Sequence, residues 1–354
     1  MGGRAAAASY PERDAMKALV TGGNGFLGRY IVEKLLEKGW SITSLSRRQD
    51  GELARLGVPT ITASVTDKAA LGRACAGMDA VFHVAAKVGM GGPWNEFYQT
   101  NVIGTQNVIE ACVNNGVPRL IYTSSPSVVF DGSDHDLLDE SAPYPERYLA
   151  HYPKSKALAE QDVLQANGAG GLLTCSLRPH LVWGPRDTNL IPRLIDRAKK
   201  GKVKIIGAGE NIVSNVYVEN AADAHLLAAE KLAPGSPVAG SAYFITQREP
   251  VRLWDWINEI LKGLDLPPVT SKIPFGVAYA VGAAMELAYG ALGLEGEPMM
   301  TRFLAQQMAR SHHYSIEKAR RELGWEPAIG HKEGMARLIA DFKARGRRRL
   351  LKSA

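Results

Sequence analysis

The segment VTGGNGFLGRY, residues 20–30, constrains the fold more than any other part of this chain. It follows the apolar run KALVTGG, which predicts a buried strand, and it opens RYIVEKLLEKG, whose apolar residues recur at helical spacing. Gly23, Gly25 and Gly28 form G-x-G-x-x-G, while Gly22 with the last two forms G-x-x-G-x-x-G. Such glycines let the backbone approach a pyrophosphate, which the N-terminus of the following helix attracts. The segment therefore predicts a dinucleotide-binding site.

Strands and helices are expected to alternate from this loop to about residue 185. SITSLS, DAVFHVAA, RLIYTSS and LLTCSLRP are predicted strands, and NVIGTQNVIEACVNNG and residues 152–165 are predicted helices. This alternation predicts an α/β fold with a doubly wound parallel sheet and a smaller, mainly helical substrate lobe. The predicted divisions are a flexible extension over residues 1–15, a dinucleotide-binding domain over 16–185 and 212–246, a substrate-binding lobe over 186–211 and 247–340, and a basic tail over 341–354.

The charge distribution argues against a nucleic-acid partner. The net charge of the 354 residues is +6. The excess is held by the tail residues Lys343, Arg345, Arg347, Arg348, Arg349 and Lys352. The body is therefore neutral and lacks the cationic face that a phosphate backbone requires. We expect a solvated tail, with a contact to anionic lipid or a partner as the alternative.

The cysteines and the N-terminus indicate a cytoplasmic protein. Cys75, Cys112 and Cys175 are far apart and show neither metal-ligand nor redox spacing, so they are expected to be buried thiols in a reducing compartment, with no metal site. Residues 1–15 lack the apolar core of a secretory signal.

Residues 273–294 form an apolar segment, IPFGVAYAVGAAMELAYGALGL, whose only charged residue is Glu286. The segment is long enough to span a bilayer, but its glycine, alanine and tyrosine content makes it only mildly hydrophobic. We favour a buried or pocket-lining helix. Attachment to a membrane surface and a true span are the alternatives, so a peripheral membrane contact through this segment and the basic tail stays open.

The end of the second predicted strand favours NADP(H) over NAD(H). An acidic residue about 20 positions after the glycines would bind the ribose hydroxyls of NAD, but Ser46 stands in that region, followed by Arg47 and Arg48. A guanidinium can hold a 2′-phosphate in a forked contact. The alternative is two exposed arginines on a loop, and Asp50 lies slightly too late unless the loop is shifted. Asp67, after the third strand, either accepts a hydrogen bond from adenine or caps a helix.

Tyr152 and Lys156 lie four residues apart at the start of a predicted helix and therefore share one face. A lysine ammonium near a phenol lowers the pKa of the phenol, which prepares Tyr152 to exchange a proton with a substrate oxygen. Ser125, at the end of a strand, supplies a hydroxyl that can hydrogen-bond the same oxygen. We predict these three side chains to be catalytic.

The chain resembles an extended short-chain dehydrogenase/reductase over roughly residues 17–340. The matching motifs are TGGNGFLG, FHVAA, TNVIGTQNVIEAC, YTSSPSV, YPKSK and RPHLVWGP. The resemblance implies that Lys156 also holds the nicotinamide ribose and that Asn101 supports the active-site helix. It further implies that the segment from Pro179 to Val182 lies along the nicotinamide. It also implies that homodimers are common. The full predicted cofactor site consists of Gly22, Gly25, Phe26, Leu27, Gly28, Arg47, Arg48, Asp67, Ala85, Tyr152, Lys156, Pro179 and Val182.

Within this superfamily, YTSSPSVVFDG and GLLTCSLRPHLVWGP are most similar to the 3β-hydroxysteroid dehydrogenase branch. The resemblance implies an NAD(P)-dependent oxidoreductase that interconverts a 3-hydroxy and a 3-keto group on a bulky lipid-like substrate, either a sterol carboxylate or a 2-alkyl-3-keto acid. Lys87, His180 and Arg186 are candidates to seat the substrate carboxylate. The alternatives are a nucleotide-sugar epimerase or dehydratase and, less favoured, a non-catalytic NADP-sensing regulator.

Overall fold

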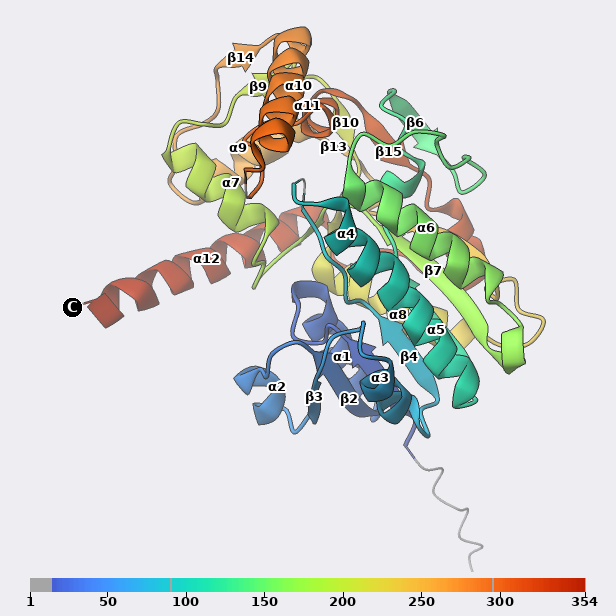
Figure 1. Ribbon diagram of the computed structural model, residues 1–354. Coiled ribbons are helices and arrows are strands. Elements are labelled where there is room, and N and C mark those ends of the chain that lie inside the picture. Colours follow the sequence, from blue (N-terminus) through green and yellow to red (C-terminus); the bar gives the residue numbers. More distant parts are fainter. Residues whose placement is uncertain (1–14, 90, 295, 354) are drawn as a thin grey trace, which may run out of the picture.

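Seven parallel strands form the central sheet of the computed structural model, which describes residues 15–89, 91–294 and 296–353 (Figure 1). Along the sheet the order is β12-β7-β5-β4-β1-β2-β3. The strands are β1 (Lys17–Thr21), β2 (Ser41–Ser46), β3 (Thr60–Thr62), β4 (Ala80–His83), β5 (Arg119–Thr123), β7 (Leu173–Pro179) and β12 (Ser241–Ile245). The order reverses between β1 and β4, where a doubly wound sheet binds its ligand. The predicted fold class is confirmed.

Helices cover both faces of the sheet because its strands are apolar on both sides. Leu19 of β1 and Val81 of β4 face one layer, whereas Val20 and Phe82, one residue further along, face the other. The first layer contains α3 (Lys68–Cys75), α5 (Gly104–Asn114) and α6 (His151–Gln165), and the second contains α1 (Phe26–Glu37) and α8 (Val218–Lys231). Short connecting helices are α2 (Gly51–Arg55), α4 (Trp94–Phe97), η1 (Tyr98–Ile103), η2 (Pro126–Val129) and η3 (Ala169–Gly171).

The remaining elements build a second, mainly helical core around Trp183, Trp254 and Trp256. Its helices are α7 (Leu190–Lys199), α9 (Leu253–Gly263), α10 (Phe275–Leu292) and α11 (Arg302–Ala309), whereas the turn η4 (Ala319–Leu323) packs with the core of the central sheet. The short strands outside the central sheet are β6 (His135–Leu138), β8 (Val182–Trp183), β9 (Ile205–Ile206), β10 (Ile212–Val213), β11 (Val216–Tyr217), β13 (Val251–Arg252), β14 (Lys272–Ile273) and β15 (His312–Tyr314). The domain boundaries drawn from the sequence stay predictions.

The two ends of the chain differ in how much of them is described. Of the predicted extension over residues 1–15, only residue 15 lies within the described part. At the other end, α12 (His331–Ser353) runs without a break through residue 341, where the sequence suggests that a separate tail begins. Figure 1 shows this helix projecting from the body.

The apolar segment at residues 273–294 forms α10, and the expectation that this helix is buried is wrong. Only Ala278 and Gly282 of the helix are buried, on the side that packs against α11. Leu287 is 74% exposed and Leu292 is 71% exposed. Within the described residues, α10 is also the one helix that is long and apolar enough to cross a membrane. Composition could not reveal which side of this helix the rest of the protein covers.

Candidate active site

The glycine loop joins β1 to α1 at the switch point of the sheet. Gly22 has a φ of 72°, which favours glycine, and a Cβ on it would lie 2.9 Å from Cα of Ala85, two residues after β4. A Cβ on Gly28 would lie 2.2 Å from the carbonyl oxygen of Gly22, so the turn closes directly onto the first turn of α1. The loop thus has the tight form that pyrophosphate binding requires.

The N-terminus of α1 is open to an anion. The helix begins at Phe26, followed by Leu27, and no described side chain caps it or places an acidic group in its first turn. Its first backbone N–H groups and the positive end of the helix dipole therefore remain for a ligand. This arrangement fits the pyrophosphate of a nicotinamide dinucleotide.

The end of β2 places the predicted specificity residues beside this loop. Ser46 is buried, whereas Arg47 and Arg48 are exposed, and the backbone carbonyl of Arg48 accepts a hydrogen bond from Asn24 Nδ2 at 3.2 Å. Asp50 is engaged elsewhere: it caps α2 through the N–H of Glu52 at 2.7 Å and accepts a hydrogen bond from Arg29 at 2.5 Å. The shifted-loop alternative, in which Asp50 binds the ribose, is therefore not favoured by these contacts.

Asp67 begins α3 and caps it. Its Oδ1 accepts a hydrogen bond from the N–H of Ala70 at 3.0 Å, which satisfies one of the free N–H groups at the helix start. The capping interpretation of Asp67 is confirmed by this bond. Its contact with adenine stays a prediction.

Lys156 is held inside the protein by the end of β5. The side chain is 2% exposed, and Nζ donates a hydrogen bond to the carbonyl oxygen of Thr123 at 2.5 Å. The ammonium also lies 4.1 Å from the ring centroid of Tyr122. Burial lowers the pKa of Lys156 to about 7, and the negative charge of Glu160 opposes that change. Thr123 and Tyr122 were not among the residues predicted from the sequence.

Tyr152 and Ser125 meet at the carboxyl end of the sheet. Ser125 begins η2, and its Oγ accepts hydrogen bonds from the N–H of Ser127 at 3.3 Å and from Ser127 Oγ at 3.0 Å, so its own proton remains available. Burial raises the pKa of Tyr152 to about 12, and a hydrogen bond with Ser125 opposes that change. The expected lowering of the pKa of Tyr152 by Lys156 is therefore wrong for the protein's own groups, because desolvation of the phenolate dominates and the group that opposes it is Ser125.

Asn101 connects the predicted helix to the loop after β4. Its Nδ2 donates to Ser155 Oγ at 2.9 Å and to the carbonyl of Lys87 at 2.9 Å, and its Oδ1 accepts from the N–H of Lys87 at 2.7 Å. Ser155 Oγ in turn donates to the carbonyl of Tyr152 at 2.9 Å. Asn101 therefore positions the first turn of α6, as the resemblance implies. Pro179 ends β7, and Val182 begins β8, where it pairs with Val216.

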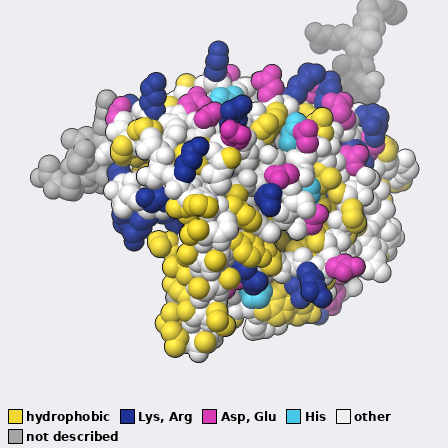
Figure 2. Space-filling model, turned by 90° about the horizontal axis from the view of Figure 1, so that it is seen from above, with side chains coloured by type: hydrophobic (Ala, Val, Ile, Leu, Met, Phe, Trp, Pro, Cys, Tyr) yellow, Lys and Arg dark blue, Asp and Glu magenta, His cyan; other side chains and the backbone are white. Residues whose placement is uncertain are grey.

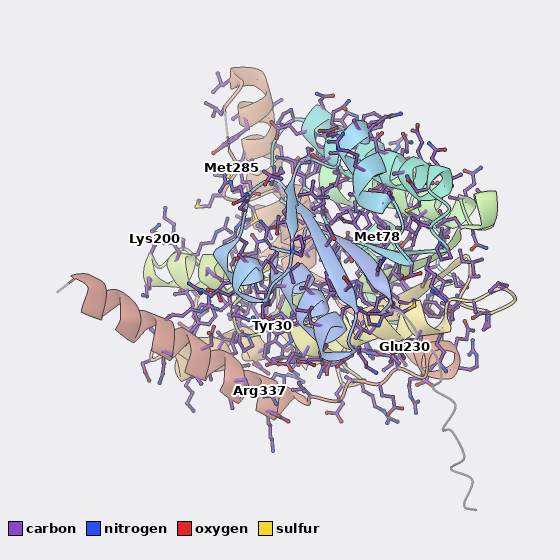
Figure 3. All side chains as sticks on the ribbon, turned by 90° about the horizontal axis from the view of Figure 1, so that it is seen from below. Tyr30, Met78, Lys200, Glu230, Met285 and Arg337 are labelled. Atoms are coloured by element: carbon purple, nitrogen blue, oxygen red, sulfur yellow. The ribbon has the colours of Figure 1, made fainter. Side chains whose placement is uncertain are left out.

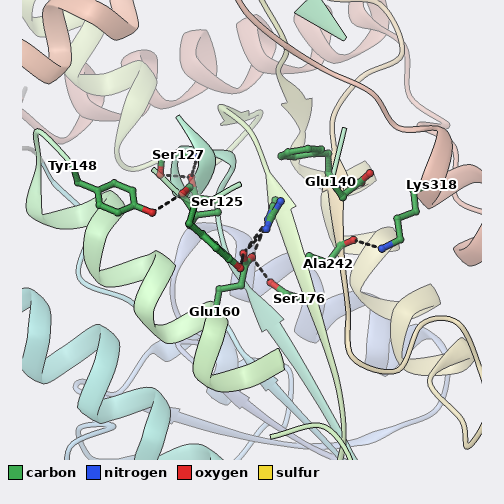
Figure 4. Close-up of polar contacts among 12 residues, drawn as sticks. Ser125, Ser127, Glu140, Tyr148, Glu160, Ser176, Ala242 and Lys318 are labelled. Atoms are coloured by element: carbon green, nitrogen blue, oxygen red, sulfur yellow. Dashed lines mark hydrogen bonds and ion pairs between the residues drawn. The ribbon is translucent and has the colours of Figure 1, made fainter. Parts of the chain in front are cut away.

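A buried ion pair lies one turn beyond Lys156 and was missed from the sequence (Figure 4). Glu160 is fully buried, and Arg178 reaches it with Nη2 at 2.6 Å and Nε at 3.0 Å. Tyr144 and Ser176 also donate hydrogen bonds to Glu160, each at 2.7 Å. The arginine holds the pKa of Glu160 below its usual range despite burial. The spacing of four residues from Lys156 to Glu160 was the available signal.

The three residues proposed to bind a substrate carboxylate each contact another side chain of the protein. Lys87 pairs with Glu96 at 2.5 Å, and Arg186 pairs with Glu33 at 2.6 Å while its guanidinium stacks over Tyr30, labelled in Figure 3. His180 is buried and hydrogen-bonds His312 at 2.7 Å. Burial and the neighbouring His312 hold the pKa of His180 well below its usual value, so it is neutral. The proposal that His180 is a cation is wrong.

A doubly wound sheet, a glycine loop at its switch point and a serine, tyrosine and lysine gathered at the carboxyl ends of its strands define an extended short-chain dehydrogenase/reductase. Comparison with protein-family models matches residues 19–275 to the 3-beta hydroxysteroid dehydrogenase/isomerase family. The chain belongs to this family. It is an NAD(P)-dependent oxidoreductase that interconverts hydroxyl and keto groups.

Relatives and a solved structure agree with this assignment. The 2-alkyl-3-oxoalkanoate reductase of Stenotrophomonas maltophilia (strain K279a) is 45% identical over 331 residues, 93% of this chain and 100% of the relative. The decarboxylating sterol-4-alpha-carboxylate 3-dehydrogenase of Mus musculus is 37% identical and covers 93% of this chain and 91% of its own. The structure of MoeE5 in complex with UDP-glucose and NAD is 25% identical with a TM-score of 0.72, over 93% of this chain and 99% of the other.

Proposed function

We propose that the protein reduces the 3-keto group of a 2-alkyl-3-keto acid, with NADPH as the hydride donor. The observation that carries the proposal is the position of the Tyr152 hydroxyl beside Ser125, on a helix whose next turn holds the buried Lys156. The 2-alkyl-3-oxoalkanoate reductase of Stenotrophomonas maltophilia is similar to this chain over the full length of that reductase.

Each residue of the site has its own role in the reduction. Ser125 donates a hydrogen bond to the substrate carbonyl oxygen, and Tyr152 gives that oxygen its proton as the C–O single bond forms. Lys156, fixed on the carbonyl of Thr123, would hold the nicotinamide ribose through its ammonium. A bound nicotinamide dinucleotide supplies the hydride that the carbonyl carbon accepts. Solvent then returns a proton to Tyr152.

Reduction of the ketone uses Tyr152 in its protonated form. Its pKa of about 12 means that the phenol carries its proton at neutral pH. Reduction of a ketone needs that proton, whereas oxidation of an alcohol needs the phenolate. A 3-keto acid readily loses carbon dioxide because its ketone accepts the electrons, so reduction also preserves the carboxylate.

The choice of NADPH is supported by the end of β2. Arg47 and Arg48 are exposed beside the glycine loop, Ser46 leaves room where an acidic residue would repel a phosphate, and Asp50 is held by Arg29. A guanidinium is suited to a 2′-phosphate because it offers paired N–H donors.

Three other functions are less well supported. A sterol-4-carboxylate dehydrogenase shares the chemistry of the site and is the main alternative substrate class, favoured by the mouse relative. A nucleotide-sugar epimerase is suggested by the complex of MoeE5 with UDP-glucose, but that likeness is at 25% identity. A non-catalytic regulator has no need of Tyr152 and Lys156.

Purified protein assayed with a short-chain 2-alkyl-3-keto acid tests the proposal. We expect NADPH to be oxidised at a kcat/KM at least 10-fold above that for NADH, and a sterol 4-carboxylate with NADP⁺ to turn over more slowly. Faster oxidation of the sterol than reduction of the keto acid would overturn the proposed substrate.

For partners and location, we propose a lipid-like substrate that the protein meets at a membrane surface, as a peripheral protein of the cytoplasm. The exposed apolar helix α10 supports this proposal. Pairing of two chains into a homodimer stays a prediction, and the side chains of residues 347–354 of the basic tail lie outside the described part.

A further inference from the structure

A buried histidine of α8 lies behind the candidate active site, on the opposite face of the central sheet from α6. His225 is 0% exposed, so it differs from the histidine side chains that Figure 2 shows on the surface of one face of the molecule. Burial lowers the pKa of His225 to about 4, so the ring is uncharged at neutral pH and carries one proton. No step of the proposed reduction uses this ring directly.

The partners of His225 determine which ring nitrogen carries that proton. Nδ1 lies 2.7 Å from the carbonyl oxygen of Ala221, one turn earlier in α8, and Nε2 lies 2.8 Å from Oγ1 of Thr123. A carbonyl oxygen can only accept a hydrogen bond, so Nδ1 is the protonated nitrogen. Nε2 therefore carries a lone pair, and the hydroxyl of Thr123 donates a hydrogen bond to it.

Thr123 connects this histidine to Lys156 through the sheet. Ile121, two residues earlier in β5, packs in the core on the side of α1 and α8, and the side chain of Thr123 points to the same side because side chains alternate along a strand. The backbone carbonyl of Thr123 accepts the hydrogen bond of Lys156 Nζ, which comes from α6 on the other side. One residue thus touches both layers of helices.

The position of Thr123 in the sheet explains why its hydroxyl contact matters. The pairing of β5 with β4 ends at Tyr122, whereas the pairing with β7 continues to Thr123. The end of β5 is therefore held by a neighbouring strand on one side only. The bond from the Thr123 hydroxyl to His225 adds a second attachment, from α8, at the residue whose carbonyl holds the ammonium.

We infer that His225 is a positioning residue for the reaction: it holds the hydroxyl of Thr123 and thereby fixes the carbonyl that binds the ammonium of Lys156. The inference rests on the proposed function for the role of Lys156, whereas the three hydrogen bonds do not depend on it. The other titratable groups that face Lys156 stay unchanged in the variants, and they are Glu160, Tyr122 and His83.

His225→Leu tests the inference because it removes the acceptor and fills the space with an apolar side chain. A weaker bond from the Thr123 carbonyl destabilises the charged form of Lys156, so the pKa of Lys156 should fall below its value of about 7. Because lysine is charged below its pKa, the alkaline limb of a kcat/KM profile with NADPH and a short-chain 2-alkyl-3-keto acid should move to lower pH by at least about 0.5 unit. We expect kcat at pH 7 to fall at least about 5-fold, while the KM for the keto acid changes less than about 2-fold.

Three further variants separate positioning from packing. Thr123→Val removes the same hydrogen bond and keeps the backbone carbonyl, so it should move the limb by a similar amount, and Thr123→Val/His225→Leu should move it no further. His225→Gln, whose amide oxygen can accept a hydrogen bond in place of Nε2, should restore most of the shift. Ile121→Val, which shortens a buried side chain on the same face of β5, is the matched control: it should lower stability to urea and leave the pH profile in place.

Two measurements do not require turnover, so a failure of the proposed substrate is recognised separately. Heteronuclear NMR of the histidine rings, with the signals of His225 identified by their loss in His225→Gln, should show Nδ1 as the protonated nitrogen. In a fluorescence titration without substrate, the affinity for NADPH should fall as the pH rises through the pKa of Lys156, and this fall should occur at lower pH in His225→Leu. A proton on Nε2 of His225 would overturn the inference, as would folded His225→Leu and Thr123→Val proteins whose kinetic and binding profiles match those of Ile121→Val.

Discussion

Lys156 Nζ donates a hydrogen bond to the carbonyl oxygen of Thr123 at 2.5 Å, and this contact joins α6 to the end of β5. Thr123 lies two residues before Ser125, so one strand end positions both the ammonium and the hydroxyl of the candidate site. Because Lys156 is buried, its charge depends on few neighbours, and each of them can be tested by its effect on the pH dependence of activity.

Glu160→Gln is expected to narrow the pH range of activity. The negative charge of Glu160 raises the pKa of Lys156, which burial holds at about 7. Lys156 is charged below its pKa, so activity that needs the ammonium is lost as the pH rises through that value. Without the carboxylate, the alkaline limb of a kcat/KM profile should move to lower pH by about one unit.

Tyr144→Phe is the control for this variant. It removes a neutral hydrogen bond to Glu160 and leaves the charge, so the pH profile should keep its position. Because Glu160→Gln leaves the Arg178 guanidinium buried without its partner, circular dichroism must first show a folded protein. A folded Glu160→Gln protein with an unmoved profile would limit Glu160 to a structural role.

Arg47→Ala/Arg48→Ala is expected to remove the preference for NADPH. If the two guanidinium groups hold the 2′-phosphate, the KM for NADPH should rise at least 10-fold, while the KM for NADH should change less than 2-fold. Ser46→Asp should act in the same direction because its carboxylate repels a phosphate. An equal rise of the KM values for NADPH and NADH would show that the arginines contact a part of the cofactor that both dinucleotides have.

The buried histidines predict a loss of stability in acid. Burial holds the pKa of His83 at about 3 and those of His225 and His312 at about 4, below the usual 6.5. Between pH 6.5 and 5 the unfolded chain therefore binds protons that the folded protein does not, so the free energy of unfolding falls as the pH falls. Urea unfolding should show His312→Gln with a slope shallower by up to about 1.4 kcal/mol per pH unit. An unchanged slope would show that His312 charges in the folded state.

Local sequence patterns were sufficient to predict the sheet, the glycine loop and the helix starts of the site. The glycine spacing predicts a tight turn, and this turn joins β1 to α1. Tyr152 and Lys156 lie at the start of a predicted helix, and Ser125 follows the end of a predicted strand. Asn101 could be placed only through the resemblance, because its partners Ser155 and Lys87 come from different elements.

The parts that could not be predicted depend on contacts between distant segments. His180 is neutral because β15 brings His312 against it, 132 positions along the chain, and Glu160 is ionised because Arg178 of β7 reaches α6. The pKa of Tyr152 rises through burial, which the spacing to Lys156 does not reveal. In the same way, only the packing of α11 decides which side of α10 stays exposed.

The most direct measurement of the central claim is the turnover of Tyr152→Phe with NADPH and a 2-alkyl-3-keto acid, beside a fluorescence titration of NADPH binding. The account predicts that kcat falls by at least about 100-fold, because the proton donor is lost, while the Kd for NADPH stays within 3-fold. A variant that keeps its kcat would contradict the assignment of Tyr152 as the proton donor.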